Sequence, residues 1–253
     1  MEDVVVIEWI YSPADYFEGA IRISRDEYEM TVHSGKVEAK IKPEVYDKDC
    51  KIRDVIHCTL NGRFLGVELL THQAYELSEP RLYRLHRDGR KDVTIFPKPC
   101  VVTVSMGAPD IIITDKYVNL VSDSRKERIE KKKEVAELVE KYLTKDLVVA
   151  SLLNSYHSAV NDPDNELIHM YEIRDALSKK FGDERQAYTN LGLSSAQWSR
   201  LGQLANNEPL KQGRHRGKSA GTLRDATEKE LEEARAIART FVKAYLDYLE
   251  IRS

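Results

Sequence analysis

The hydrophobic period of this chain changes near residue 122, and that change constrains the fold more than any other feature. Before residue 122, short segments alternate apolar and polar residues, as strands of a sheet do. Seven segments show this pattern: residues 19–24, 28–34, 36–42, 64–70, 93–96, 101–105 and 110–115. The sequences HSGK, LNGR and RDGR predict hairpin turns, because glycine adopts positive φ without strain. Roughly eight to ten strands with no helical interval predict an antiparallel β-sandwich or open barrel over residues 1–121.

From Ser122 the pattern becomes helical. Residues 122–145 predict a charged connecting helix with an apolar stripe that includes Val135 and Val139. We interpret its lysine run as a solvated helix face, because mixed charges along a helix are typical of exposed surface.

Further helices are predicted near residues 146–160, 165–181, 184–191 and 194–205. The C-terminal helix is the clearest element, because Thr227 and Glu230 have the spacing of a capping box and an apolar stripe follows them. We therefore expect an α+β protein of two domains, in which a helical bundle over residues 146–253 follows the β-rich domain.

The composition excludes several classes of protein. With 42% hydrophobic and 32% charged residues and a net charge of −3, the chain is typical of soluble proteins and not of a general nucleic-acid coating protein. Cys50, Cys58 and Cys100 have neither paired nor zinc-binding spacing, which favours a reducing cytoplasm and no metal. No apolar run is long enough for a membrane span, and MEDVVVIEW is not typical of a signal peptide. We expect a cytoplasmic protein without a cofactor.

The strongest functional feature is a basic loop over residues 211–218, KQGRHRGK. Lys211, Arg214, Arg216 and Lys218 supply four cations and no acid intervenes, a pattern suited to RNA phosphates. Trp198, close by in sequence, is a candidate for stacking on a base. The alternative is a solvated loop whose arginines pair with the acid-rich residues 228–233.

His215 suggests a catalytic step. Between two arginines its pKa should be lowered, so that the neutral imidazole accepts the proton of an RNA 2′-hydroxyl. Arg214 or Arg200 would stabilise the charged phosphorane, which amounts to metal-independent RNA cleavage. The alternative is a surface histidine without a catalytic task. Asn154, Tyr156 and His157 form another possible polar cluster, which we interpret as a structural contact.

The helical half resembles the HEPN-like domains of prokaryotic defence and toxin proteins. The resemblance rests on the sequences at residues 146–182, 193–218 and 223–249, and it covers about 108 residues. A β-rich domain before such a domain is similar to the ApeA-like abortive-infection family. The resemblance implies a homodimer formed by the helical domain and, in active members, a metal-independent endoribonuclease.

The catalytic signature of that family is an arginine, a polar residue, a few further residues and a histidine. Arg214 directly precedes His215, and Arg200 lies 15 positions before it, so neither has the family spacing. Two hypotheses therefore remain. The first is an RNA-associated antiviral defence protein that cleaves RNA. The second is a non-catalytic module that dimerises and binds a protein partner through its β domain.

Overall fold

The computed structural model describes residues 3–95, 112–114, 120–214 and 223–252. The chain forms two compact units. The sheet unit falls within residues 1–67 and 75–135, and the helical unit within residues 68–74 and 136–253. The division lies inside a helix, between Val135 and Ala136, so the predicted connecting helix is shared between the units.

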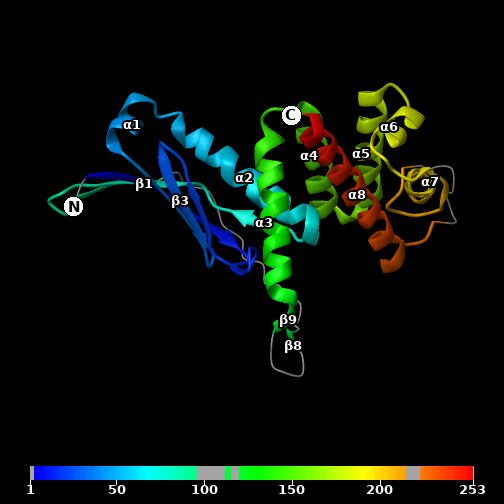
Figure 1. The fold of residues 1–253 in the computed structure, drawn as a ribbon, viewed down its shortest axis with the longest axis horizontal. Helices are drawn as coiled ribbons and strands as arrows, with labels where there is room; N and C mark the ends of the chain where they lie inside the picture. The colour runs from blue at the N-terminus through cyan, green and yellow to red at the C-terminus, as the bar shows by residue number, and fades with distance from the viewer. Residues whose placement is uncertain (1–2, 96–111, 115–119, 215–222, 253) are drawn as a thin grey trace. The chain divides into compact units, whose positions relative to one another are not determined.

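The sheet unit is built on one open antiparallel sheet of seven strands in the order β2-β3-β4-β1-β6-β7, with β5 paired to β1 (Figure 1). The strands are β1 (Val4–Ser12), β2 (Ile21–Ser24), β3 (Tyr28–His33), β4 (Lys36–Ile41), β5 (Glu76–Leu77), β6 (Arg81–Leu85) and β7 (Lys91–Ile95). The mixed α and β content and the antiparallel sheet are confirmed. The described residues form neither the expected β-sandwich nor the expected open barrel, because helix α2 instead of a second sheet packs on this open sheet.

The alternation of apolar and polar residues determines which side chains of a strand are buried. In β3 every second residue is buried, beginning with Tyr28, and the residues between them are exposed. The predicted HSGK turn joins β3 to β4, with Ser34 and Gly35 both at positive φ. A Cβ atom on Gly35 would lie 3.1 Å from the Cβ of Ala14, so this turn favours glycine for space as well as for conformation.

Helix α2 (Ile52–Thr71), preceded by the short α1 (Pro43–Lys48), corrects the sequence prediction. Residues 64–70 were predicted as a strand and LNGR as a turn, and both lie within α2. Ile56, Leu60 and Phe64 recur every four residues and are fully buried against the sheet. A short apolar run fits the period of a strand and that of a helix equally well. Here the run belongs to a longer helical pattern, whose apolar side chains cover one face of the sheet.

The sheet unit continues through the hairpin of β8 (Ile112–Thr114) and β9 (Leu120–Asp123) into α3 (Ser124–Leu143). The predicted segments at 93–96 and 110–115 overlap β7 and β8, whereas the segment at 101–105 lies outside the described residues. The predicted helix over 122–145 corresponds to α3, although residues 122 and 123 belong to β9 and the helix ends at Leu143. Arg128 and Lys132 of α3 both pair with Glu18, at 2.7 and 2.5 Å.

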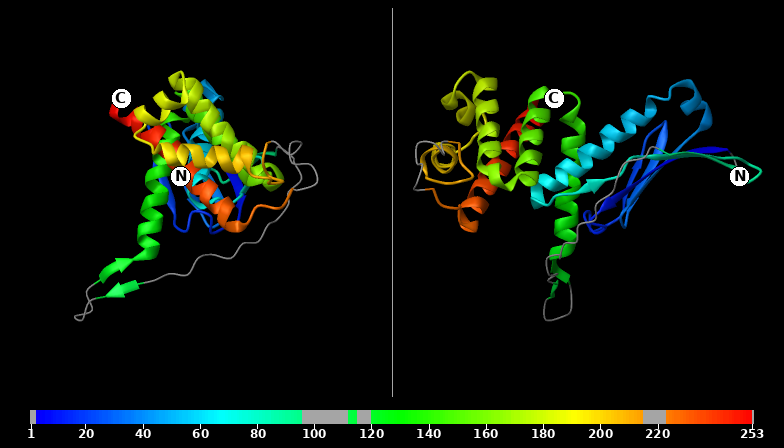
Figure 2. Two further views of the ribbon diagram at one scale, coloured as in Figure 1. Left: turned by 90° about the vertical axis from the view of Figure 1, so that its right-hand side faces the viewer. Right: turned by 180° about the vertical axis from the view of Figure 1, so that it is seen from behind.

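The helical unit contains the five helices that the sequence predicted. They are α4 (Leu147–Asn161), α5 (Glu166–Phe181), α6 (Glu184–Asn190), α7 (Ser195–Gly202), which continues as a π-helical turn (Gln203–Asn207), and α8 (Glu228–Arg252). Helix α8 runs beside α4 and α5 (Figure 1, Figure 2). Its predicted capping box is confirmed, because the Thr227 amide donates to Glu230 Oε2 at 2.8 Å and the Glu230 amide donates to Thr227 Oγ1 at 3.3 Å.

Candidate nucleic-acid interface

The basic loop leaves the helical unit from a closed stem. The amide of Lys211 donates to the carbonyl of Arg224 at 3.0 Å, and the amide of Arg224 donates to the carbonyl of Pro209 at 3.0 Å. Leu210 and Arg224 therefore form a parallel β-bridge. Backbone hydrogen bonds therefore hold the segments on either side of residues 212–223 next to each other.

Gly213 and Arg214 fix the first half of the loop against the π-helical turn. The Arg214 amide donates to the carbonyl of Ala205 at 2.7 Å. A Cβ atom on Gly213 would lie only 2.9 Å from that carbonyl oxygen, closer than real Cβ contacts. Glycine is therefore needed for the backbone to approach the turn this closely, and the position of Arg214 follows from it.

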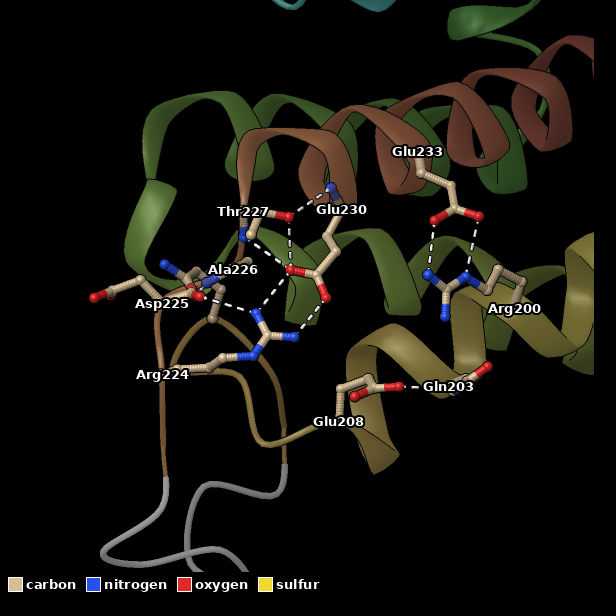
Figure 3. A network of polar contacts seen from close by, with 10 residues as sticks. Arg200, Gln203, Glu208, Arg224, Asp225, Ala226, Thr227, Glu230 and Glu233 are labelled. Atoms are coloured by element: carbon tan, nitrogen blue, oxygen red, sulfur yellow. Dashed lines mark hydrogen bonds and ion pairs between the residues drawn. The ribbon is translucent and has the colours of Figure 1, made fainter.

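Most of the cations around the stem pair with acids. Arg224 donates to both carboxylate oxygens of Glu230, at 2.6 and 2.8 Å, and Arg200 forms a two-pronged pair with Glu233, at 2.8 and 3.0 Å (Figure 3). Lys211 pairs with Asp225 at 2.9 Å. The sequence analysis left open the alternative that arginines pair with the acid-rich residues 228–233. Arg200 and Arg224 form such pairs.

These pairs perturb the titration of the acids at the start of α8. The Arg224 guanidinium, together with the Thr227 amide, lowers the pKa of Glu230 to about 2. The Arg200 guanidinium also holds the pKa of Glu233 below its usual value. Both carboxylates are therefore ionised at neutral pH and neutralise their arginines.

Arg214 has different surroundings. Its guanidinium carbon lies over the ring of Tyr171, 4.5 Å from the centroid, and its NH1 atom lies 3.5 Å from Asp175 Oδ2. Its side chain is 39% exposed. Because the contact to Asp175 is long, Arg214 is paired less closely than Arg200 or Lys211.

Trp198 lies in the core of the helical unit. Its ring is 1% exposed and stacks on Phe241 with the centroids 5.0 Å apart. The guanidinium carbon of Arg174 lies 5.4 Å from the ring centroid, over the ring. A base stacks only on an accessible ring face, so Trp198 offers no surface to RNA in this structure.

The structure thus brings together only some of the predicted site residues. His215, Arg216 and Lys218 lie outside the described residues. Arg200 and Arg214 contact different helices, α8 and α5, through Glu233 and Asp175 respectively. Lys211 lies in the stem of the loop, paired with Asp225.

A second polar cluster in the helical unit was missed by the sequence analysis. Glu166, only 2% exposed at its side chain, accepts hydrogen bonds from Arg235 Nε at 2.7 Å and Arg235 NH2 at 3.0 Å. His72 Nε2 lies 3.3 Å from Glu166 Oε1, and its Nδ1 lies 3.3 Å from the hydroxyl of Tyr156. Because Glu166 and Arg235 are 69 positions apart, no local pattern connects them.

The predicted polar contact at Tyr156 and His157 belongs to this region. His157 Nδ1 lies 2.8 Å from Glu68 Oε2, and Glu68 is buried. The Glu68 carboxylate raises the pKa of His157. Burial alone would raise the pKa of Glu166, but the hydrogen bonds from His72 and Arg235 outweigh burial, and the pKa lies below its usual value. Each buried carboxylate in this cluster is therefore matched by a basic partner.

Within the described ranges, no group of three or more His, Cys, Asp and Glu side chains is arranged to hold a metal ion. None of the helices described there combines the length and apolarity that crossing a bilayer requires. Comparisons with known protein families, with curated proteins and with solved structures find no match to this chain.

Proposed function

We propose that the helical unit binds RNA through the basic loop at residues 211–218. The observation that supports this most directly is the presentation of Arg214. Its backbone is fixed to the carbonyl of Ala205, its side chain is 39% exposed, and the acid nearest to it among the described residues, Asp175, is 3.5 Å away. A planar guanidinium held in this way is suited to a phosphate.

The loop concentrates charge within a chain of net charge −3. Around it, Arg200, Lys211 and Arg224 form close pairs with acids, whereas the contact of Arg214 with Asp175 is longer, at 3.5 Å. A local cationic surface on an acidic protein attracts an anionic polymer at one place only.

The proposal includes a cleavage step. The neutral imidazole of His215 takes the proton of a 2′-hydroxyl, the 2′-oxygen attacks the adjacent phosphorus, and the bond to the 5′-oxygen breaks. The leaving 5′-oxygen takes up a proton from water and the imidazolium returns its proton to solvent, so that the products are a 2′,3′-cyclic phosphate and a 5′-hydroxyl. Arg214 stabilises the charge that develops on the phosphoryl oxygens. Arg200 does not enter this proposal, because both of its described hydrogen bonds go to Glu233. Because the helical half resembles HEPN-like domains, the proposal also includes a homodimer formed by the helical unit.

Binding is tested with a fluorescein-labelled single-stranded RNA of about 20 nucleotides, followed by fluorescence anisotropy at low salt. Arg214→Gln should weaken binding several-fold. Lys243→Gln is the matched control, because Lys243 is an exposed cation of α8 that pairs with Asp247. Equal affinity of the wild type and both variants would overturn the role of the loop.

Cleavage is tested by incubating the protein with total cellular RNA in the presence of EDTA, beside the Arg214→Ala/His215→Ala variant. Fragments with the wild type alone are the expected result. Intact RNA in both samples would rule out the proposed cleavage step. RNA binding would then be tested by anisotropy alone.

The alternative is a non-catalytic module that dimerises through the helical unit and binds a protein partner through the sheet unit. The pairing of Arg200 and Lys211 with acids favours it, because paired cations are less available to phosphate. A dimer in light scattering together with no RNA binding at low salt would support this alternative over the first.

A further inference from the structure

Cations and aromatic rings alternate from the basic loop into the core of the helical unit. Arg214 lies over Tyr171 at 4.5 Å, and Arg174 lies over the same ring at 5.0 Å. Arg174 also lies over Trp198 at 5.4 Å, and Trp198 stacks on Phe241 at 5.0 Å. We call these five residues the cation–aromatic column.

The inner part of the column is rigidly held. Arg174 is 7% exposed, and its NH1 atom donates to the hydroxyl of Tyr171 at 2.7 Å while its NH2 atom donates to Glu184 at 2.6 Å. A Cβ atom on Gly202 would lie 3.5 Å from the guanidinium carbon of Arg174, so α7 packs closely on this side chain. The ring of Tyr171 is therefore fixed in orientation by a buried arginine.

The outer end of the column is accessible. The guanidinium carbon of Arg214 lies over the ring of Tyr171, and its NH1 atom lies 3.5 Å from Asp175 Oδ2. Pairs elsewhere around the stem are shorter, at 2.9 Å for Lys211 with Asp225 and 2.6 Å for Arg224 with Glu230. The Arg214 guanidinium is thus positioned by a ring face but only weakly bonded along its edge.

We infer that Tyr171 positions Arg214 to bind a phosphate of single-stranded RNA, and that this phosphate displaces Asp175. The inference rests on the proposed function and adds to it the role of Tyr171 and Asp175. The side chain of Arg214 is 39% exposed, and an exposed guanidinium can donate along its edge to two phosphate oxygens. Asp175 competes with the phosphate for that edge, because both are anions.

RNA binding should therefore depend on the shape of the Arg214 side chain as well as on its charge. A lysine at this position keeps the positive charge but has neither the planar face for Tyr171 nor the forked donors for phosphate. Loss of a cation–π contact at an exposed site corresponds to about a two- to fivefold loss of affinity.

The test uses the same labelled RNA and the full chain, with matched variants of Tyr171. Tyr171→Phe keeps the ring face but removes the hydroxyl that accepts from Arg174 NH1 at 2.7 Å, and Tyr171→Leu removes both. We expect about two- to fivefold weaker binding for Tyr171→Leu and a smaller loss for Tyr171→Phe. Arg214→Lys should weaken binding by a similar factor, and Asp175→Asn should strengthen it.

A double-variant cycle separates positioning from general folding effects. Once Arg214 is replaced by alanine, Tyr171→Leu should cause no further loss of affinity. Arg214→Lys alters no core residue, so it tests the inference even where Tyr171→Leu unfolds the protein.

If the wild type binds RNA and Arg214→Lys binds equally well, the inference is wrong and the proposed function stands. Independent, additive losses for Tyr171→Leu and Arg214→Ala would also overturn the inference. If the wild type binds no RNA, the proposed function itself fails.

Discussion

Replacing Arg235 by methionine should destabilise the helical unit severely. The change leaves the buried carboxylate of Glu166, 2% exposed, without its two hydrogen bonds at 2.7 and 3.0 Å. Removing one partner of a buried ion pair typically costs about 3–5 kcal/mol. His72 remains 3.3 Å from Glu166, so we expect the lower end, about 3 kcal/mol. This corresponds to a fall of about 10 °C in the Tm of the unit.

The assay is thermal and urea unfolding followed by circular dichroism. Lys243→Met is the matched control, because Lys243 lies on the same helix in an exposed pair with Asp247 at 2.8 Å. Exposed pairs of this kind contribute about 0–1 kcal/mol, so the control should lose less than 1 kcal/mol.

The pH dependence provides a second test of the same reasoning. In the wild type the pKa of Glu166 is lowered, so its pairing stabilises the fold above the usual carboxylate pKa and is lost as the pH falls through the folded value. Without Arg235, burial should raise that pKa, and protonation at pH 4 should relieve part of the defect. Equal losses for Arg235→Met and Lys243→Met, or a defect of the same size at pH 4 and pH 7, would refute this reasoning.

Three further predictions follow from single contacts. Gly213→Ala should shift the loop stem, because its Cβ would lie 2.9 Å from the carbonyl of Ala205, and faster hydrogen exchange at the stem amides would show this. Thr227→Ala removes the cap of α8 and should cost about 1 kcal/mol in urea unfolding. Glu68 raises the pKa of His157, so this pair stabilises the fold below the usual histidine pKa and less as the pH rises through the folded value. The stability lost in His157→Gln should therefore be larger at pH 5.5 than at pH 8.5; an equal loss at both would contradict this.

The parts of the fold that depend on neighbouring residues were predictable. Alternation located β3 and β4, and spacing located the capping box at Thr227 and Glu230. The run at residues 64–70 was assigned to a strand because seven residues fit either period. Its helical identity depends on Ile56, Leu60 and Phe64 packing together on the sheet, which is a tertiary effect.

The candidate site likewise combines features that the sequence shows with contacts that only the fold creates. The concentration of charge at residues 211–218 is visible in the sequence, and so is the acid-rich start of α8. The placement of Arg214 over Tyr171 joins residues 43 positions apart and required the structure. Trp198 was misjudged because nearness to the loop in sequence does not reveal burial against Phe241.

The central claim, that the loop at residues 211–218 binds RNA, is tested most directly by the salt dependence of binding. Anisotropy titrations with single-stranded RNA at several salt concentrations would compare the wild type with a variant carrying glutamine at Lys211, Arg214, Arg216 and Lys218. Because Lys211 pairs with Asp225, we count Arg214, Arg216 and Lys218 as the phosphate contacts, so log K should fall with log salt with a slope of about −2.1 in the wild type, since each contact contributes about 0.7. The variant should bind weakly, with a slope near zero. The same affinity and slope in both proteins would contradict the account.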